Sequence, residues 1–187
     1  MQWLGIDYGS KMAGTTAICW NEGSQLHLQQ SSKNKDADKF ILDHVSRLRP
    51  QTIYIDAPLS LPSIYSQGTG DNYFYRECDV KLKAMSPMFI GGLTARGIKL
   101  KDDLKKAGVE VNEVYPAALV RTLLLGEAYK QDLKKFMVTI TDLMDAKIPS
   151  IGNWHQVDAI LAWISGKRHQ ENRAESHGRP SEGIILV

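Results

Sequence analysis

The sequence predicts an α/β fold in which helices flank a central mixed sheet. Short apolar segments rich in β-forming residues alternate with segments whose apolar residues recur at helical spacing. Short turns join the first three β segments, which favours antiparallel pairing, whereas the later ones follow helices, which favours parallel strands. Because 187 residues are close to the roughly 150 residues of one domain, we expect a single domain over residues 1–187.

Composition and charge exclude several classes of protein. Hydrophobic residues make up 43% of the chain and charged residues 24%, which is enough apolar material for a core and argues against disorder. A formal net charge of +2 is too small to argue for non-specific binding to DNA or membranes, and it neither requires nor excludes a nucleic-acid substrate. Cys19 and Cys78 fit no metal-ligand spacing, so we expect two free thiols in a reducing compartment.

The N-terminal segment lacks the features of a secretion signal. Residues 1–6 carry no basic side chain, and Asp7 interrupts the apolar run early. No later segment approaches the run of about 18 apolar residues that a membrane-spanning helix needs. We therefore expect a cytoplasmic protein that does not act on membranes.

Three antiparallel strands are expected first. Residues 3–7 form an apolar run that ends at Asp7 and enters a turn at Tyr8-Gly9-Ser10. Residues 14–20 are rich in β-forming side chains, and residues 25–30 alternate apolar and polar positions.

A helix and a fourth strand follow. Over residues 36–48, apolar side chains repeat at helical spacing, and acidic residues precede basic ones along the helix, as its dipole favours. Pro50 ends this helix. Residues 52–56 then repeat the pattern of the first strand, an apolar run that ends at Asp56, and Ala57-Pro58 forces the chain out of the strand.

The rest of the chain predicts an inserted segment and further helices. Residues 57–75 resemble a loop too long to be an idle connection, which indicates a lid or a substrate contact. We place an inserted loop and helix segment at about 57–100 and a polar, mobile segment at about 166–181. Helices are expected over 76–85, 95–107, 117–125, 131–145 and 154–167, and strands over 109–114 and 182–187.

Three aspartates occupy unusual positions in this scheme. Asp7 and Asp56 end two strands whose carboxyl ends would share one sheet edge, about 4.8 Å apart if the strands are neighbours. Asp158 falls within the apolar stripe of the last helix, where an unpaired carboxylate is costly. His155 lies three residues earlier on the same side of that helix. The stripe consists of Trp154, Val157, Leu161 and Ile164.

Each of these residues also has an ordinary structural interpretation. An aspartate at a strand end is often a turn residue, Asp158 could pair with an arginine, and His155 could be a surface residue. The coincidence of three acids at three distant places favours a shared site. Carboxylate oxygens suit Mg²⁺ or Mn²⁺, and two such ions about 4 Å apart promote phosphodiester hydrolysis.

A series of short motifs resembles a known family. The motifs are Gly5-Ile6-Asp7-Tyr8-Gly9, Ile55-Asp56-Ala57-Pro58-Leu59, Arg76-Glu77-Cys78-Asp79, Arg96-Gly97, Glu113-Val114-Tyr115-Pro116-Ala117, His155-Gln156-Val157-Asp158-Ala159 and Glu182-Gly183-Ile184. Their order, over nearly the whole chain, resembles the family catalogued as domain of unknown function 429, described as predicted nucleases with a ribonuclease H-like fold. More broadly, the first-strand and last-helix motifs resemble the Holliday-junction resolvase and its relatives.

The resemblance implies a ribonuclease H-like fold and a metal-dependent nuclease acting on DNA or RNA. It implies that Asp7, Asp56 and Asp158 are catalytic carboxylates that bind Mg²⁺ or Mn²⁺. It further implies that His155 assists catalysis.

Four other residues are candidate substrate contacts. Arg76 and Asp79, three residues apart on one expected helix, form either a substrate-binding pair or an ion pair on a solvated face. Glu113 ends a strand about 10 Å from that of Asp7, which favours a supporting or substrate-contact role. Arg96 is either a phosphate clamp or a charge on a helix surface.

Two other classes of function stay open. The Asp-x-Gly motif at Asp7 and the later Gly14 also suit a nucleotide-binding or ATPase domain of the actin and sugar-kinase type, although a second Asp-Gly motif is missing. The modest aromatic content of 8% and the near-neutral charge suit a catalytically inactive scaffold that binds a partner protein. The sequence leaves the oligomeric state open.

Overall fold

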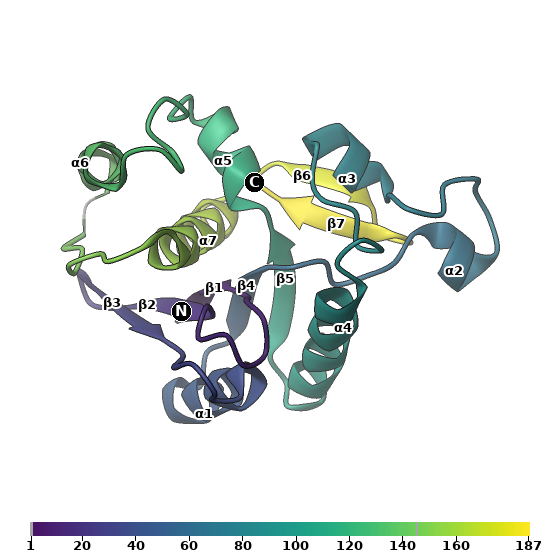
Figure 1. The fold of residues 1–187 in the computed structure, drawn as a ribbon, viewed down its shortest axis with the longest axis horizontal. Coiled ribbons are helices and arrows are strands. Elements are labelled where there is room, and N and C mark those ends of the chain that lie inside the picture. Colours follow the sequence, from purple (N-terminus) through teal and green to yellow (C-terminus); the bar gives the residue numbers. More distant parts are fainter. Residues whose placement is uncertain (1, 145) are drawn as a thin grey trace.

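The computed structural model describes residues 2–144 and 146–187. In these residues seven strands form one sheet in the order β3-β2-β1-β4-β5-β7-β6 (Figure 1). Strands β1, β2 and β3 pair antiparallel with one another, β4, β5 and β7 continue the sheet in parallel from β1, and β6 is antiparallel to β7. This topology confirms the predicted central mixed sheet, with three antiparallel strands and further parallel strands. The strands are β1 (Trp3–Asp7), β2 (Ala17–Glu22), β3 (Gln25–Gln30), β4 (Thr52–Asp56), β5 (Glu110–Val114), β6 (Ser176–Arg179) and β7 (Gly183–Leu186).

Helices cover both faces of the sheet. Helices α1 and α4 pack on one face, and α5, α6 and α7 pack on the other (Figure 1). The central strands are therefore buried on both sides, which explains their continuous apolar runs. The helices are α1 (Ala37–Leu48), α2 (Ser63–Gln67), α3 (Glu77–Leu82), α4 (Gly91–Lys106), α5 (Pro116–Thr122), α6 (Leu133–Leu143) and α7 (Trp154–Gln170).

Capping side chains and a proline mark the N-terminal ends of three helices. The Asp36 side chain accepts hydrogen bonds from the first turn of α1, and the Asn153 side chain accepts one from the Gln156 amide at the start of α7. Pro116 occupies the first turn of α5, where its missing N–H costs no hydrogen bond.

Several expected boundaries are corrected. Helix α4 begins at Gly91, four residues before its predicted start, and the expected loop at 57–75 contains the short helix α2. Helix α6 ends at Leu143, and the predicted last residue of that helix, Asp145, lies outside the described residues.

The segment 166–181, expected to be polar and mobile, contains regular structure. Residues 166–170 continue α7, and Ser176–Arg179 forms β6. Strand β6 pairs only with β7, at the edge of the sheet, so its polar sequence carries no alternating apolar signal. Within the described residues, no helix has the length and apolarity required to cross a membrane.

Candidate active site

Asp7 and Asp56 lie side by side at one edge of the sheet. Strands β1 and β4 are parallel neighbours, and their register pairs Asp7 directly with Asp56. Three buried residues precede Asp7, and four precede Asp56, so each aspartate is the first partly exposed position as its strand leaves the core. The expectation that the two strands are neighbours is confirmed.

Asp7 is held by a histidine from α7. The Nδ1 atom of His155 lies 2.7 Å from Oδ2 of Asp7. This hydrogen bond raises the pKa of His155. The pKa of Asp7 is raised because burial disfavours its charge, and the bond to His155 opposes that rise. The two residues, predicted separately for one site, are in direct contact.

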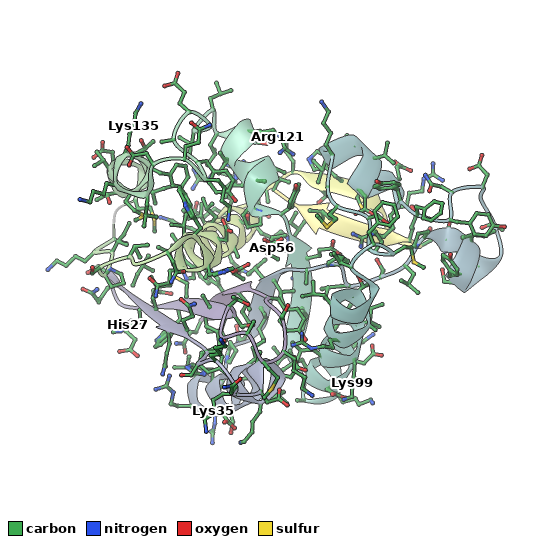
Figure 2. The ribbon with its side chains drawn as sticks, in the orientation of Figure 1. His27, Lys35, Asp56, Lys99, Arg121 and Lys135 are labelled. Carbon is green, nitrogen blue, oxygen red and sulfur yellow. The ribbon has the colours of Figure 1, made fainter. Side chains whose placement is uncertain are left out.

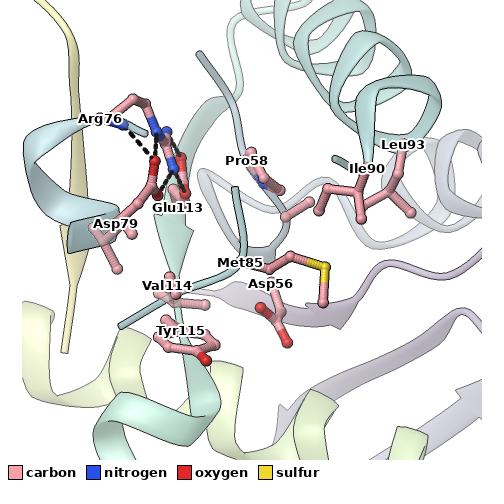
Figure 3. Close-up of a pocket in the computed structure, with 13 residues that line it drawn as sticks. Asp56, Pro58, Arg76, Asp79, Met85, Ile90, Leu93, Glu113, Val114 and Tyr115 are labelled. Atoms are coloured by element: carbon pink, nitrogen blue, oxygen red, sulfur yellow. Dashed lines mark hydrogen bonds and ion pairs between the residues drawn. The ribbon is translucent and has the colours of Figure 1, made fainter. Parts of the chain in front are cut away.

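Asp56 has the least compensated charge of the group. Its pKa is raised well above the ordinary range, first by burial and then by the negative charges of Asp7 and Asp158. Among the residues drawn in Figure 3, no dashed contact reaches its carboxylate. Figure 2 shows Asp56 near the middle of the molecule, whereas the labelled lysines lie at its periphery.

Asp158 is buried, as its place in the apolar stripe predicts, and two neighbouring side chains hold it. The Tyr129 hydroxyl donates a hydrogen bond of 2.7 Å to Oδ1, and the Lys130 ammonium contacts Oδ2. Sequence reasoning missed Tyr129 and Lys130, because they lie in an irregular loop before α6 where no periodicity marks a side chain as inward-facing.

The carboxylates of the site, all within the described residues, do not form a closed metal-binding cage. Within residues 2–144 and 146–187, no three His, Cys, Asp or Glu side chains converge closely enough to enclose a metal ion. Two of the three aspartates are instead engaged by other side chains. The donor chemistry of Asp7 and Asp56 fits a hard divalent cation, since carboxylate oxygens are its preferred ligands in proteins.

Three predicted substrate contacts bind one another. The Arg76 guanidinium donates to Asp79 Oδ1 and to Glu113 Oε1, both at 2.6 Å. The side chains of Arg76 and Asp79 are 1% and 0% exposed. Arg76 and Asp79 do form an ion pair, but the pair is buried, so the alternative of an ion pair on a solvated face is wrong about its exposure to solvent. Glu113 also accepts a hydrogen bond from the Leu59 amide, which ties the first residues after β4 to β5.

A small pocket opens between this ion triad and Asp56. Its volume is about 90 Å³. Figure 3 shows Asp56 and Met85 at one side of the pocket and the Arg76 triad at the other. Ile90 and Leu93, at the N-terminal end of α4, contribute apolar side chains to its lining. Residues of the connection between β4 and β5 thus form a wall of the pocket.

Arg96 lies close to the strand end but contacts protein groups. Its guanidinium donates to both oxygens of Asp38, at 2.6 and 3.1 Å, and to the Gly9 carbonyl at 3.1 Å. It also lies over the Tyr8 ring, 4.6 Å from its centroid. Arg96 therefore fixes the loop that follows Asp7 and is not a solvated helix charge.

Comparisons with known proteins identify structures of similar fold. No family model matches the chain, and no curated protein matches its sequence. The structure of Thermus thermophilus RuvC is 14% identical, with a TM-score of 0.48 over 95% of this chain and 99% of that chain. The yeast mitochondrial Holliday junction resolvase Ydc2 is 14% identical, with a TM-score of 0.47 over 91% of this chain and 81% of that one. Similarity at this level does not assign an activity.

Proposed function

We propose that this chain hydrolyses phosphodiester bonds in DNA or RNA, with Mg²⁺ or Mn²⁺ bound by Asp7 and Asp56 and with Asp158 completing the acidic site. The observation that carries the proposal is Asp56, a carboxylate of uncompensated charge paired in register with Asp7. A divalent ion would neutralise that charge and present a phosphate oxygen to the site.

His155 is the candidate general base. Its Nδ1 atom is engaged by Asp7, which leaves Nε2 as the nitrogen that accepts a proton. The side chain is 42% exposed, so water reaches it. In the proposed step, the oxygen of a water bonds to phosphorus while Nε2 takes one proton of that water, and the bond from phosphorus to the leaving oxygen breaks as that oxygen takes a proton from solvent.

The inserted segment supports the substrate. Because Arg76, Asp79 and Glu113 satisfy one another, we assign them the role of a rigid pocket wall, with Arg96 holding the loop after Asp7. Apolar side chains of the pocket would contact the nucleotide next to the scissile phosphate.

The decisive experiment is a cleavage assay on single-stranded, duplex and branched DNA and on RNA, with Mn²⁺ or with chelator. We expect cleavage that chelator abolishes and that Asp56→Asn lowers by about a hundredfold or more. Asp43→Asn is the matched control, because Asp43 lies on the exposed face of α1. ATP binding without cleavage would favour the actin and sugar-kinase type instead, and unchanged activity in Asp56→Asn would refute the proposed site.

A further inference from the structure

Several interactions hold Lys130 against Asp158 in the acidic site. The Lys130 ammonium touches Oδ2 of Asp158, whose side chain is 7% exposed. It also lies over two aromatic rings, 5.3 Å from the centroid of Tyr129 and 5.7 Å from that of Trp154. A lysine placed against a buried carboxylate and two ring faces is held by electrostatic attraction from several sides.

The backbone also fixes this lysine in place. Lys130 has φ of 61°, a left-handed conformation that residues with a side chain rarely adopt. The adjacent Tyr129 donates to the other oxygen of Asp158 and packs against Phe136, a fully buried residue of α6. Tyr129 thereby anchors the loop to α6 and α7 directly beside Lys130, whose ammonium faces the site.

The charges of the site then fit one divalent ion. Asp7, Asp56 and Asp158 are electrostatically coupled, and the positive charge of Lys130 acts on both Asp7 and Asp56. With all three carboxylates ionised and His155 neutral, as a general base must be, the carboxylates and Lys130 together carry a net charge of minus two, which a single divalent cation neutralises. Asp158 has both oxygens engaged, so Asp7 and Asp56 remain as the pair for that cation.

We propose that Lys130 fills the second cation position of the acidic site, so that the site binds one divalent ion and Lys130 supplies the other positive charge to the phosphate. This inference rests on the proposed nuclease function. A lysine ammonium is a compact point charge that suits phosphate, and it can take the place of a metal ion without needing ligands in a fixed coordination geometry. The residue would thereby touch the substrate as well as Asp158.

The test counts bound Mn²⁺ by calorimetry and by electron paramagnetic resonance. Lys130→Met keeps the length of the side chain and its packing against the rings but removes the charge. We expect one ion in the unmodified protein and two in Lys130→Met, with the second ion at the vacated oxygen of Asp158. Lys130→Arg, which keeps the charge, and Tyr129→Phe, which keeps Lys130, should each bind one ion.

Cleavage provides a second readout. We expect Lys130→Met to cut about tenfold or more slowly at low Mn²⁺ and to recover as Mn²⁺ is raised, with a steeper dependence on metal concentration than the unmodified protein. Melting curves show whether each variant is folded, and if Lys130→Met does not fold, the count in the unmodified protein and in Lys130→Arg decides.

Several outcomes overturn the inference. Two ions in the unmodified protein, or a single ion in a folded Lys130→Met, would show that Lys130 does not replace a cation. If cleavage depends on Mn²⁺ in those cases, the proposed nuclease function stands without it. If the unmodified protein binds no Mn²⁺, both proposals fail. A second ion in Lys130→Met, together with no cleavage of any polynucleotide by the unmodified protein, would show that Lys130 replaces a cation and would refute the nuclease.

Discussion

Gly5 of β1 lies directly against the backbone of Trp163 in α7. A Cβ atom on Gly5 would come within 2.2 Å of the Trp163 amide nitrogen and 2.5 Å of the Ala159 carbonyl oxygen. Only glycine permits this approach. Because β1 ends at Asp7 and α7 carries His155, the contact sets how close these two site residues lie.

Gly5→Ala should therefore destabilise the fold. The clash involves backbone atoms, which cannot rotate away, so we expect a loss of about 3 kcal/mol or more in the free energy of unfolding. Chemical denaturation measures it. Gly91→Ala is the control, since a Cβ there meets no atom within 4 Å and should leave stability nearly unchanged. Equal stabilities of the two variants would contradict the packing described for α7.

The buried triad predicts a second large effect. Arg76→Met leaves Asp79 and Glu113 charged and buried without their partner, and we expect it to cost about 3–5 kcal/mol. Lys99→Met breaks the exposed pair with Asp103, which water screens, and should leave the free energy of unfolding nearly unchanged. A small effect of Arg76→Met in urea denaturation would show that the triad is open to water.

The central sheet was predictable because its strands are marked by composition and by their ends. Apolar runs that stop at Asp7 and at Asp56 predict two buried strands and one shared edge, and the register confirms it. Strand β6 escaped prediction because pairing at the sheet edge with β7 requires no apolar side chain.

The partners of the predicted site residues were less predictable than the residues themselves. The stripe on α7 indicates that Asp158 faces inward, yet nothing in the sequence indicates that a loop 28 positions earlier supplies Lys130. Likewise, the spacing of Arg76 and Asp79 indicates that they can pair, but the third member, Glu113, comes from β5 and meets Arg76 only in the folded chain. Such pairings arise from tertiary structure and leave no local periodicity.

The variant Arg96→Met distinguishes a role of Arg96 in positioning the loop from a contact with phosphate. Because its guanidinium is engaged by Asp38 and the Gly9 carbonyl, we expect Arg96→Met to lower stability by about 1–3 kcal/mol. The dependence of nucleic-acid affinity on salt should keep its slope. A slope shallower by about one would instead assign Arg96 to a phosphate.

The last prediction concerns Asp56 and pH. Burial and the charges of Asp7 and Asp158 raise its pKa well above the ordinary 3.8, so the ionised form is less favourable in the folded chain than in the unfolded one. Protonation of Asp56 therefore favours the folded protein, and this contribution to the free energy of unfolding is fully present below pH 3.8, where the carboxyl group is protonated in both states. That contribution is lost as pH rises through the raised pKa.

Asp56→Asn removes this penalty, and it should be more stable than the unmodified protein at neutral pH in chelator. The advantage should shrink as pH falls through the raised pKa and disappear below pH 3.8. Asp103→Asn is the opposite case, because the hydrogen bond from Lys99 lowers the pKa of Asp103, so its loss should be slightly unfavourable at neutral pH. Thermal melts across pH measure both variants. Saturating Mn²⁺ should reverse the order for Asp56→Asn, since a bound cation stabilises only the chain that retains the carboxylate. An Asp56→Asn variant that is less stable at every pH in chelator would mean that the carboxylate has a structural partner rather than an uncompensated charge.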